Sequence, residues 1–440
     1  MQFLDTRDGP SVSLHQAIAC GLAPSGGLYV PAALPVLNMA EAHHAQTLAE
    51  VAEFALAPFF AGDLLAPHLA DICREALTLE TPLKALMVEH SYVLELFHGP
   101  TAAFKDFGAR FLAACLARLP AGQAGSQETT ILVATSGDTG AAVAAAFHQR
   151  EKVRVVVLHP AGRVSARQAH QLGCFGDNIH SLQVAGSFDD CQRLVKFALN
   201  DDELRSQLTL SSANSISLGR LLPQMSYYAW AALTHQRARQ QPLNVVIPTG
   251  NLGNALAAVM ARRMGFPVGK IVFATNANAV LERFFAGDDY QPQTSVATLA
   301  NAMDVGAPSN FERLRWWYEN DLELQNAFHA QAVSDAEIEQ IIRQGEDRYG
   351  QVWCPHTATA VNVLEQLRAQ SGDWDADWAV VATAHPAKFE TIVEPLIGRA
   401  LPVPQALAAM LQRPAQHLAM AADEPTFKQF LMQQSYRAVV

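Results

Sequence analysis

One lysine in this sequence stands in a setting suited to covalent chemistry. Lys105 lies between Phe104 and Phe107, where partial burial would disfavour the ammonium form and lower the pKa of the amine. A neutral amine of this kind can form a Schiff base with an aldehyde. By itself, the stretch 97–107 is more typical of a solvated lysine at the start of a helix, because most lysine side chains lie in water. The other loops of the chain decide between these interpretations.

Hydroxyl and carboxyl side chains gather in a glycine-containing loop at 134–140. Ser136, Asp138 and Thr139 follow an apolar run and precede an alanine-rich segment. Small residues let backbone N–H groups approach a ligand, and the start of a helix favours an anion such as a carboxylate. Ser, Asp and Thr are equally good helix caps, so this loop alone fits a binding loop and an ordinary capped turn about equally well.

A second loop, at 248–254, combines two glycines with two asparagines between an apolar run and a helical pattern. Main-chain donors at a helix start suit a phosphate group. The loop is not a Walker loop, because no Gly-Lys-Ser/Thr follows it. A tight strand-to-helix turn is the alternative. The residues concerned are Gly250, Asn251, Leu252, Gly253 and Asn254.

A second anion site is predicted at 211–220, ahead of a long helical pattern. Asn214 and Ser215 supply polar groups, and Arg220 can grip a phosphate through its planar fork of donors. A surface arginine on a helix flank is the commoner situation. If both anion sites exist, they suggest a phosphorylated cofactor together with a phosphorylated substrate.

The segment 382–388 also follows an apolar run. Thr383 can hydrogen-bond a ring nitrogen without donating charge to it, while His385 and Lys388 either are solvated or line the same cleft. No second ligand stands at a suitable spacing from His385, so we expect no metal site there.

Apolar runs alternate with helical patterns from residue 90 onward, which predicts a parallel sheet covered on both faces. The chemically suggestive loops follow such runs, and sites collect at the carboxyl ends of parallel strands. Residues 1–80 look like a separate small N-terminal lobe. Strands are expected at 92–96, 130–134, 153–158, 180–184, 243–247, 271–274 and 378–382, and helices near 40–59, 109–117, 139–150, 164–172, 188–199, 217–236, 253–264 and 334–348.

Composition narrows the class of protein. A chain of 440 residues is long enough for two or three domains, and its net charge of −11 argues against a nucleic-acid partner. Its six cysteines, at 20, 73, 115, 174, 191 and 354, form no Cys-x-x-Cys pair, which favours a reduced, cytoplasmic protein. We expect neither a signal peptide nor a membrane partner, because the chain starts without a secretory pattern and has no long uncharged apolar run.

Seven motifs in fixed order carry a resemblance to a known family. They lie at 26–31, 97–101, 104–107, 134–142, 212–216, 301–305 and 383–389. With them, the sequence resembles the threonine synthases of the enterobacterial and fungal class, within the fold-type II pyridoxal-phosphate enzymes.

The resemblance implies an α/β fold like that of the tryptophan synthase β chain, with two lobes of open parallel sheet covered by helices. It implies an N-terminal domain at 1–80 and a catalytic region at 81–440, with a smaller lobe at about 90–210 and a larger one at about 211–440. The implied cofactor is pyridoxal 5'-phosphate, and the implied reaction converts O-phospho-L-homoserine and water into L-threonine and phosphate. A monomer or weak homodimer is expected. The alternatives are a related phospho-lyase or deaminase that gives a 2-oxo acid, and a non-catalytic homologue.

The resemblance also implies roles for the residues that match the motifs. Lys105 would carry the cofactor. The cofactor phosphate would lie against Gly250, Asn251, Leu252, Gly253 and Asn254, with Thr383 at the pyridine nitrogen and Asp138 near the phenolic oxygen. Ser136 and Thr139 would bind the amino-acid end of the substrate, and Asn214, Ser215 and Arg220 its phosphate, assisted by Thr101. The family commonly has Phe, Asp and Asn where this chain has Leu252, Asn254 and Ser217, and Ser217 puts one polar contact near the substrate in doubt.

Overall fold

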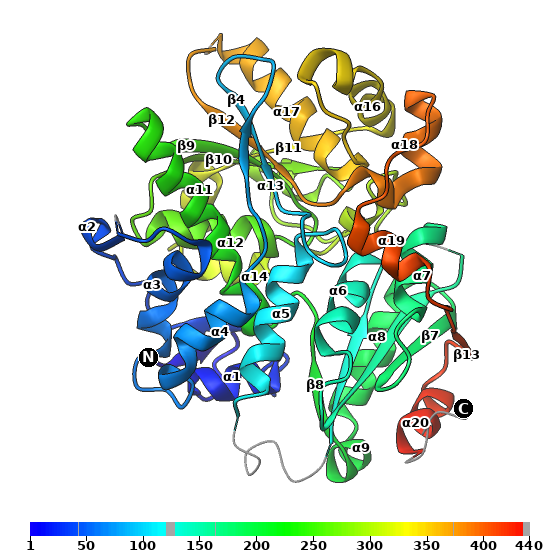
Figure 1. The fold of residues 1–440 in the computed structure, drawn as a ribbon. Coiled ribbons are helices and arrows are strands. Elements are labelled where there is room, and N and C mark those ends of the chain that lie inside the picture. Colours follow the sequence, from blue (N-terminus) through cyan, green and yellow to red (C-terminus); the bar gives the residue numbers. More distant parts are fainter. Residues whose placement is uncertain (43, 120–127, 163, 373, 434–440) are drawn as a thin grey trace.

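The computed structural model describes residues 1–42, 44–119, 128–162, 164–372 and 374–433 (Figure 1). In this part of the chain the strands form a six-stranded sheet, a five-stranded sheet and a small two-stranded sheet. The expected α/β class, with two lobes of parallel sheet beside a small N-terminal lobe, is confirmed. None of the described helices is both long and apolar enough to cross a membrane.

The N-terminal lobe is a short antiparallel pair of strands with helices packed against it. The expected helix at 40–59 is interrupted, because Thr47 starts a new helix by accepting a hydrogen bond from the Glu50 N–H in a capping box. The elements of this lobe are β1 (Phe3–Asp5), α1 (Leu14–Cys20), β2 (Tyr29–Pro31), α2 (Met39–Ala42), α3 (Leu48–Phe60), η1 (Ala66–His68) and α4 (Leu69–Ala76).

The six-stranded sheet has the order β11-β10-β9-β12-β4-β3, and every neighbouring pair is parallel except β3 with β4. Both of its faces are buried. In β9, Val245 and Ile247 belong to the core that includes helix α12, while Val246 belongs to the core that includes α17. The strands are β3 (Leu83–Ala85), β4 (Ser91–Glu95), β9 (Leu243–Pro248), β10 (Val268–Thr275), β11 (His329–Ala332) and β12 (Trp378–Ala382).

Helices surround this sheet, toward the top of Figure 1. The helix expected at 217–236 is divided in two, because Pro223 precedes the first turn of the second part and ends the continuous pattern. The helices between residues 217 and 411 are α10 (Leu218–Leu221), α11 (Gln224–Arg239), α12 (Gly253–Arg263), α13 (Val280–Phe285), η2 (Asn301–Met303), α14 (Phe311–Trp316), α15 (Asp321–Ala327), α16 (Asp335–Tyr349), α17 (Pro355–Ser371), η3 (Pro386–Phe389), α18 (Glu390–Ile397) and α19 (Gln405–Leu411).

The five-stranded sheet, at the lower right of Figure 1, is parallel throughout and has the order β13-β7-β6-β5-β8. Alternate residues of its strands again enter two cores, with Val155 on one face and Val156 on the other. Its elements are β5 (Thr129–Ala134), α6 (Asp138–Phe147), β6 (Val153–Pro160), α7 (Ala166–Gly173), β7 (Ile179–Ala185), α8 (Phe188–Asn200), α9 (Asp202–Gln207), β8 (Thr209–Ser212), β13 (Leu418–Ala421) and α20 (Glu424–Met432).

The lobe limits expected near residues 90 and 210 do not follow sheet membership. Strand β4 belongs to the six-stranded sheet, where Ser91 pairs with Trp378 of β12. Strand β13, near the C-terminus, belongs to the five-stranded sheet through its pairing with β7. Strand pairing between distant segments decides the lobes, and a pattern read along the chain cannot show such pairing.

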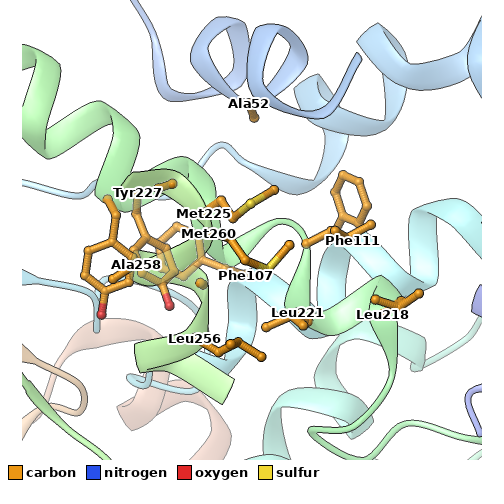
Figure 2. Packing of buried hydrophobic residues seen from close by; sticks show 14 of the residues in the cluster. Ala52, Phe107, Phe111, Leu218, Leu221, Met225, Tyr227, Leu256, Ala258 and Met260 are labelled. Carbon is orange, nitrogen blue, oxygen red and sulfur yellow. The ribbon is translucent and has the colours of Figure 1, made fainter. Parts of the chain in front are cut away.

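Helix α5 (Lys105–Leu116) is held between the lobes by a tight apolar contact (Figure 2). Phe107 and Phe111 of α5 are fully buried, and the Phe107 ring meets the Tyr227 ring edge-on at 5.2 Å. A Cβ at Gly108 would lie 2.8 Å from the Arg220 carbonyl oxygen, so α5 approaches α10 as closely as a glycine allows. This packing fixes the position of Lys105, the first residue of α5.

Candidate functional site

The predicted loops all lie at the carboxyl ends of parallel strands. In the six-stranded sheet, β9, β12 and β4 are consecutive neighbours, and they lead into the 249–252 loop, Thr383 and the Lys105 loop. In the five-stranded sheet, the neighbours β5 and β8 lead into the loops that carry Ser136 and Asn214. Carboxyl ends of parallel neighbours meet at one edge of a sheet, so each sheet contributes one edge to the site.

Lys105 lies where a Schiff-base lysine is expected. The peptide N–H of Phe104 donates to the Thr383 carbonyl at 2.8 Å, which joins the Lys105 loop to the end of β12. Burial lowers the pKa of Lys105 to about 8; the positive charges of Arg220 and Lys388 act in the same direction, and the Asp138 carboxylate opposes them. At about pH 8 half of the amine is therefore neutral and nucleophilic.

The 249–254 loop has the backbone geometry of an anion cradle. Leu252 adopts a left-handed conformation (φ 60°) immediately before α12, and no side chain caps the N–H groups of that helix. A Cβ at Gly250 would lie 2.7 Å from the Met303 Cα, so this position accepts only glycine without a backbone shift. The main-chain donors at the start of α12 therefore fit a phosphate group.

The side chains of this loop make contacts within the protein. Leu252 is 1% exposed, and Asn254 accepts hydrogen bonds from the Tyr227 and Tyr228 hydroxyls at 2.6 and 2.8 Å, leaving its buried Nδ2 without a partner. Asn251 donates to the Ser215 hydroxyl at 2.7 Å. That bond brings the two predicted anion loops into direct contact.

Arg220 is the clearest sign of a ligand in the structure. The residue is 2% exposed, and its guanidinium donates to the Ala213 carbonyl at 2.7 Å, while its Nε is buried without a partner. Burial alone lowers the pKa of Arg220 to about 10, with no carboxylate acting on it among the described residues. A buried cation without a counter-charge destabilises the fold, so an anion bound here would restore the balance. Asn214 Oδ1 and Ser217 Oγ are also buried and unpartnered.

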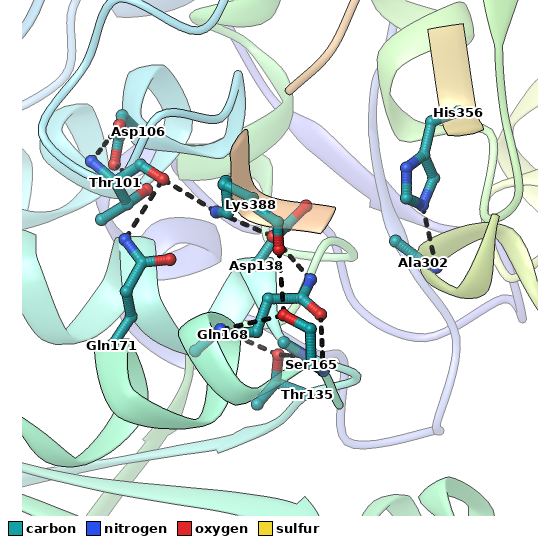
Figure 3. Close-up of polar contacts among 12 residues, drawn as sticks. Thr101, Asp106, Thr135, Asp138, Ser165, Gln168, Gln171, Ala302, His356 and Lys388 are labelled. Atoms are coloured by element: carbon teal, nitrogen blue, oxygen red, sulfur yellow. Dashed lines mark hydrogen bonds and ion pairs between the residues drawn. The ribbon is translucent and has the colours of Figure 1, made fainter. Parts of the chain in front are cut away.

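Asp138 and Thr101 have partners that the sequence did not suggest (Figure 3). The Asp138 carboxylate forms an ion pair with Lys388 at 2.8 Å and accepts a hydrogen bond from Gln168 at 3.1 Å. The Thr101 hydroxyl and N–H both donate to Asp106, at 2.7 and 2.9 Å. The hydroxyl proton of Thr101 is thus already used, and this position shapes the Lys105 loop rather than offering a donor to a phosphate.

Ser136 and Thr139 flank the start of α6 and are both partly exposed, as groups that face a ligand should be. Thr383 is 6% exposed and adjoins the Lys105 loop, where Ala384 forms a bridge with Ala103. The structure therefore brings the predicted site residues together in one region.

Two residues near the site, Lys388 and His356, are buried, which the sequence did not indicate. Lys388, for which solvation was one expectation, is fully buried. His356, at the start of α17, accepts a hydrogen bond at Nε2 from the Ala302 N–H at 3.1 Å, which places its proton on Nδ1. Burial lowers the pKa of His356 to about 4, so the ring is neutral, and its buried Nδ1 has no partner. No periodicity or motif distinguished His356 from a core residue.

No group of three or more potential ligands that could hold a metal ion occurs among the described residues. The donors do fit an aldehyde cofactor with a phosphate tail. They include an amine with a lowered pKa, an uncapped helix start behind a glycine-containing turn, and a hydroxyl at the end of the strand between them.

Comparison with known proteins matches three family models to consecutive parts of the chain. Residues 2–77 match the threonine synthase N terminus, 77–384 match the pyridoxal-phosphate dependent enzymes, and 357–431 match the threonine synthase C-terminal model. The threonine synthase of Serratia marcescens is 40% identical over 425 residues, which is 96% of each chain.

Solved structures give the same picture. The crystal structure of threonine synthase from Escherichia coli superposes with a TM-score of 0.89 at 35% identity, covering 99% of this chain and 100% of that one. The pyridoxal-phosphate-bound threonine synthase of Brucella melitensis gives a TM-score of 0.88 at 32% identity, covering 98% of both chains.

Proposed function

The chain belongs to the threonine synthase family of pyridoxal-phosphate-dependent enzymes, and from this membership we propose that its site converts O-phospho-L-homoserine and water into L-threonine and phosphate. The expected family and cofactor are thereby confirmed. One observation carries the assignment of the substrate: the buried Arg220 has no carboxylate partner among the described residues and lies within electrostatic reach of Lys105.

Pyridoxal phosphate, when bound, supplies an aldehyde for attachment to an amine and a ring that accepts the electrons released at substrate carbons. The residues that we assign to hold it have separate tasks: Lys105 provides the amine, Thr383 faces the ring nitrogen and Asp138 lies near the phenolic oxygen. The cofactor phosphate is assigned to Gly250, Asn251, Leu252, Gly253 and Asn254. Support comes from the open donors at the start of α12 and from the unpartnered Nδ2 of Asn254.

We assign the substrate phosphate to Arg220, with Asn214 and Ser215 beside it, and the amino-acid end to Ser136 and Thr139. The hydrogen bond between Ser215 and Asn251 supports this arrangement, because it places the substrate loop directly against the cofactor loop. A phosphorylated substrate would supply the charge that the Arg220 guanidinium lacks.

Lys105 has the properties of a proton carrier. Since its pKa is about 8, the free Nζ accepts a proton near neutral pH and returns it without a large energy penalty. We propose that Nζ removes the proton from Cα of the substrate and serves again when Cα is reprotonated. The partial burial of Lys105 limits competition from bulk water for that proton.

The test is a visible absorption spectrum of the purified protein, recorded before and after addition of O-phospho-L-homoserine. We expect a cofactor band that Lys105→Ala abolishes, together with equal release of phosphate and threonine by the wild-type protein. Lys428→Ala, which removes a partly exposed ion pair with Asp201, is the matched control and should behave as wild type. Formation of 2-oxobutanoate in place of threonine would indicate a deaminase, and a cofactor band without turnover would indicate a non-catalytic homologue.

We further propose a cytoplasmic protein that is a monomer or weak homodimer. All six cysteines are free thiols, which suits a reducing compartment. The large exposed apolar side chains Val36, Met87 and Trp374 lie in three separate loops, between β2 and α2, β3 and β4, and α17 and β12. Sedimentation equilibrium over a hundredfold concentration range checks the oligomeric state, and a stable tetramer would contradict it.

A further inference from the structure

We propose that Lys388 is a positioning residue of this site, which joins the two lobes and holds the Asp138 carboxylate in place near Lys105. The inference rests on the proposed function, because it concerns the same amine and the same cofactor. Lys388 differs from the residues assigned above in that it reaches the reaction through Asp138.

The contacts of Lys388 connect the two lobes. It follows β12 of the six-stranded sheet, and its Nζ donates to Asp138 Oδ1 at 2.8 Å, at the start of α6 beyond β5 of the other sheet. The same Nζ donates to the Thr101 carbonyl at 2.8 Å, in the loop that leads to Lys105. Its own carbonyl accepts from the Ser165 hydroxyl at 2.9 Å, at the cap of α7. Figure 3 shows the Lys388 side chain with Thr101 and Asp138 beside it, and Ser165 close by.

The ion pair is buried, with Lys388 at 0% and Asp138 at 4% exposure. Removing one member of a buried pair leaves an uncompensated charge, whereas replacing both with neutral groups is often tolerated. The contacts of Asp138 with Lys388 and Gln168 are both made by its Oδ1, and its second carboxylate oxygen makes no hydrogen bond or ion pair with the described residues. The pair thus orients one oxygen and leaves the other for a ligand.

Charged groups from three elements act on Lys105: Asp138 of α6 raises its pKa, and Arg220 of α10 and Lys388 of η3 lower it. His356 of α17 is neutral near pH 7. The positive charge of Lys388 therefore partly cancels the effect of the Asp138 carboxylate on the pKa of Lys105. Asp106 of α5 also faces Lys388, and burial raises the pKa of that carboxyl to about 6.

The experiment is a pH titration of the visible absorbance of the holoenzyme, which reports protonation of the Lys105–cofactor linkage independently of turnover. Lys388→Met leaves the Asp138 charge unopposed and should raise the apparent pKa by about one pH unit. Asp138→Asn leaves the Lys388 charge unopposed and should lower it by about one pH unit. The double variant should return close to the wild-type apparent pKa. Lys388→Arg keeps the positive charge, so its apparent pKa should also stay close to the wild-type value.

Opposite shifts in the two single variants support the proposal, because a purely structural role predicts no such pattern. Lys428→Met, in the surface pair with Asp201, is the matched control and should not shift the titration. An unchanged titration in Lys388→Met, or shifts of the same sign in both single variants, would overturn the inference. Should Lys388→Met fail to fold, Lys388→Gln takes its place, and the absence of an upward shift in that variant would be equally damaging. A wild-type protein without a Lys105-dependent band would instead refute the proposed function.

Discussion

Arg220 shows how much a single residue reveals once its surroundings are known. Most arginines in the described chain lie at the surface, and many pair with carboxylates, as Arg193 does with Glu424. Arg220 is buried, binds one backbone carbonyl and has an unpartnered Nε. A guanidinium in this state destabilises the unliganded protein, and the stored penalty is released when a dianionic phosphate binds.

We expect Arg220→Met to reduce kcat/KM for O-phospho-L-homoserine by about 100-fold, because it removes charge-assisted hydrogen bonds to the phosphate. An unphosphorylated analogue should lose much less. The apoprotein should keep its thermal stability, since the unpaired buried charge disappears with the side chain. Steady-state kinetics with both compounds checks the prediction. Arg205→Ala, on the exposed side of α9, is the control, and equal losses for the two compounds would place the phosphate site elsewhere.

At the scale of elements, the approach of α5 to α10 sets the distance between Lys105 and Arg220. Gly108 permits this approach, because a Cβ there would lie 2.8 Å from the Arg220 carbonyl oxygen and 3.2 Å from its Cα. Both opposing atoms belong to the backbone, so they cannot move aside as a flexible side chain can. The spacing of the two functional residues therefore depends on a residue that performs no chemistry.

Gly108→Ala should displace α10, raise KM for the phosphorylated substrate several-fold and destabilise the protein by about 1–3 kcal/mol. Kinetics and thermal unfolding on the same preparation test both effects. Gly62→Ala is a useful comparison, because Gly62 has φ 76° and open space around its Cβ position. It should lose stability through backbone strain and keep the wild-type KM. A Gly108→Ala enzyme with an unchanged KM would show that the helix spacing does not matter for substrate binding.

At the scale of the whole molecule, the C-terminal segment completes the five-stranded sheet. Strand β13 pairs with β7, and the nearby His417 faces the fully buried His159 of β6 at 3.4 Å and bonds Ser181 at 2.9 Å. Burial, reinforced by His417, lowers the pKa of His159 to about 4. The two rings thus lie between the segment near the C-terminus and the rest of its sheet.

Acidification should loosen this attachment. The folded-state pKa of His159 is below the unfolded value of about 6.5, so the unfolded chain binds more protons between these values. The stability that neutral His159 contributes is complete above about pH 6.5 and falls by about 2 kcal/mol by pH 5. Hydrogen exchange in β13 should therefore accelerate between pH 7 and pH 5 after correction for intrinsic rates. His159→Gln should weaken this dependence, and an equal acceleration in the variant would exclude His159 as its origin.

Local pattern was enough to predict most of the elements near the site. The apolar runs at 243–247 and 378–382 became β9 and β12 within one residue, because period and turn residues act over short distances. Strands β8, β11 and β13 were not predicted, because each has only four residues and so gives too short a pattern to detect. The division of the helix expected at 217–236 by Pro223 could have been anticipated, since proline interrupts helical hydrogen bonding.

The sequence by itself determined most of the longer strands, which loops carry donors, and that Lys105 stands between aromatic residues close to the start of a helix. Only the tertiary structure decided that β9, β12 and β4 are neighbours, that Arg220 is buried without a counter-charge, and that Lys388 reaches Thr101 across a separation of 287 residues. The physical reason is the range of the forces involved. Hydrophobic periodicity and turn chemistry act among near neighbours in the chain, whereas burial and charge pairing depend on which distant segments the sheets bring together.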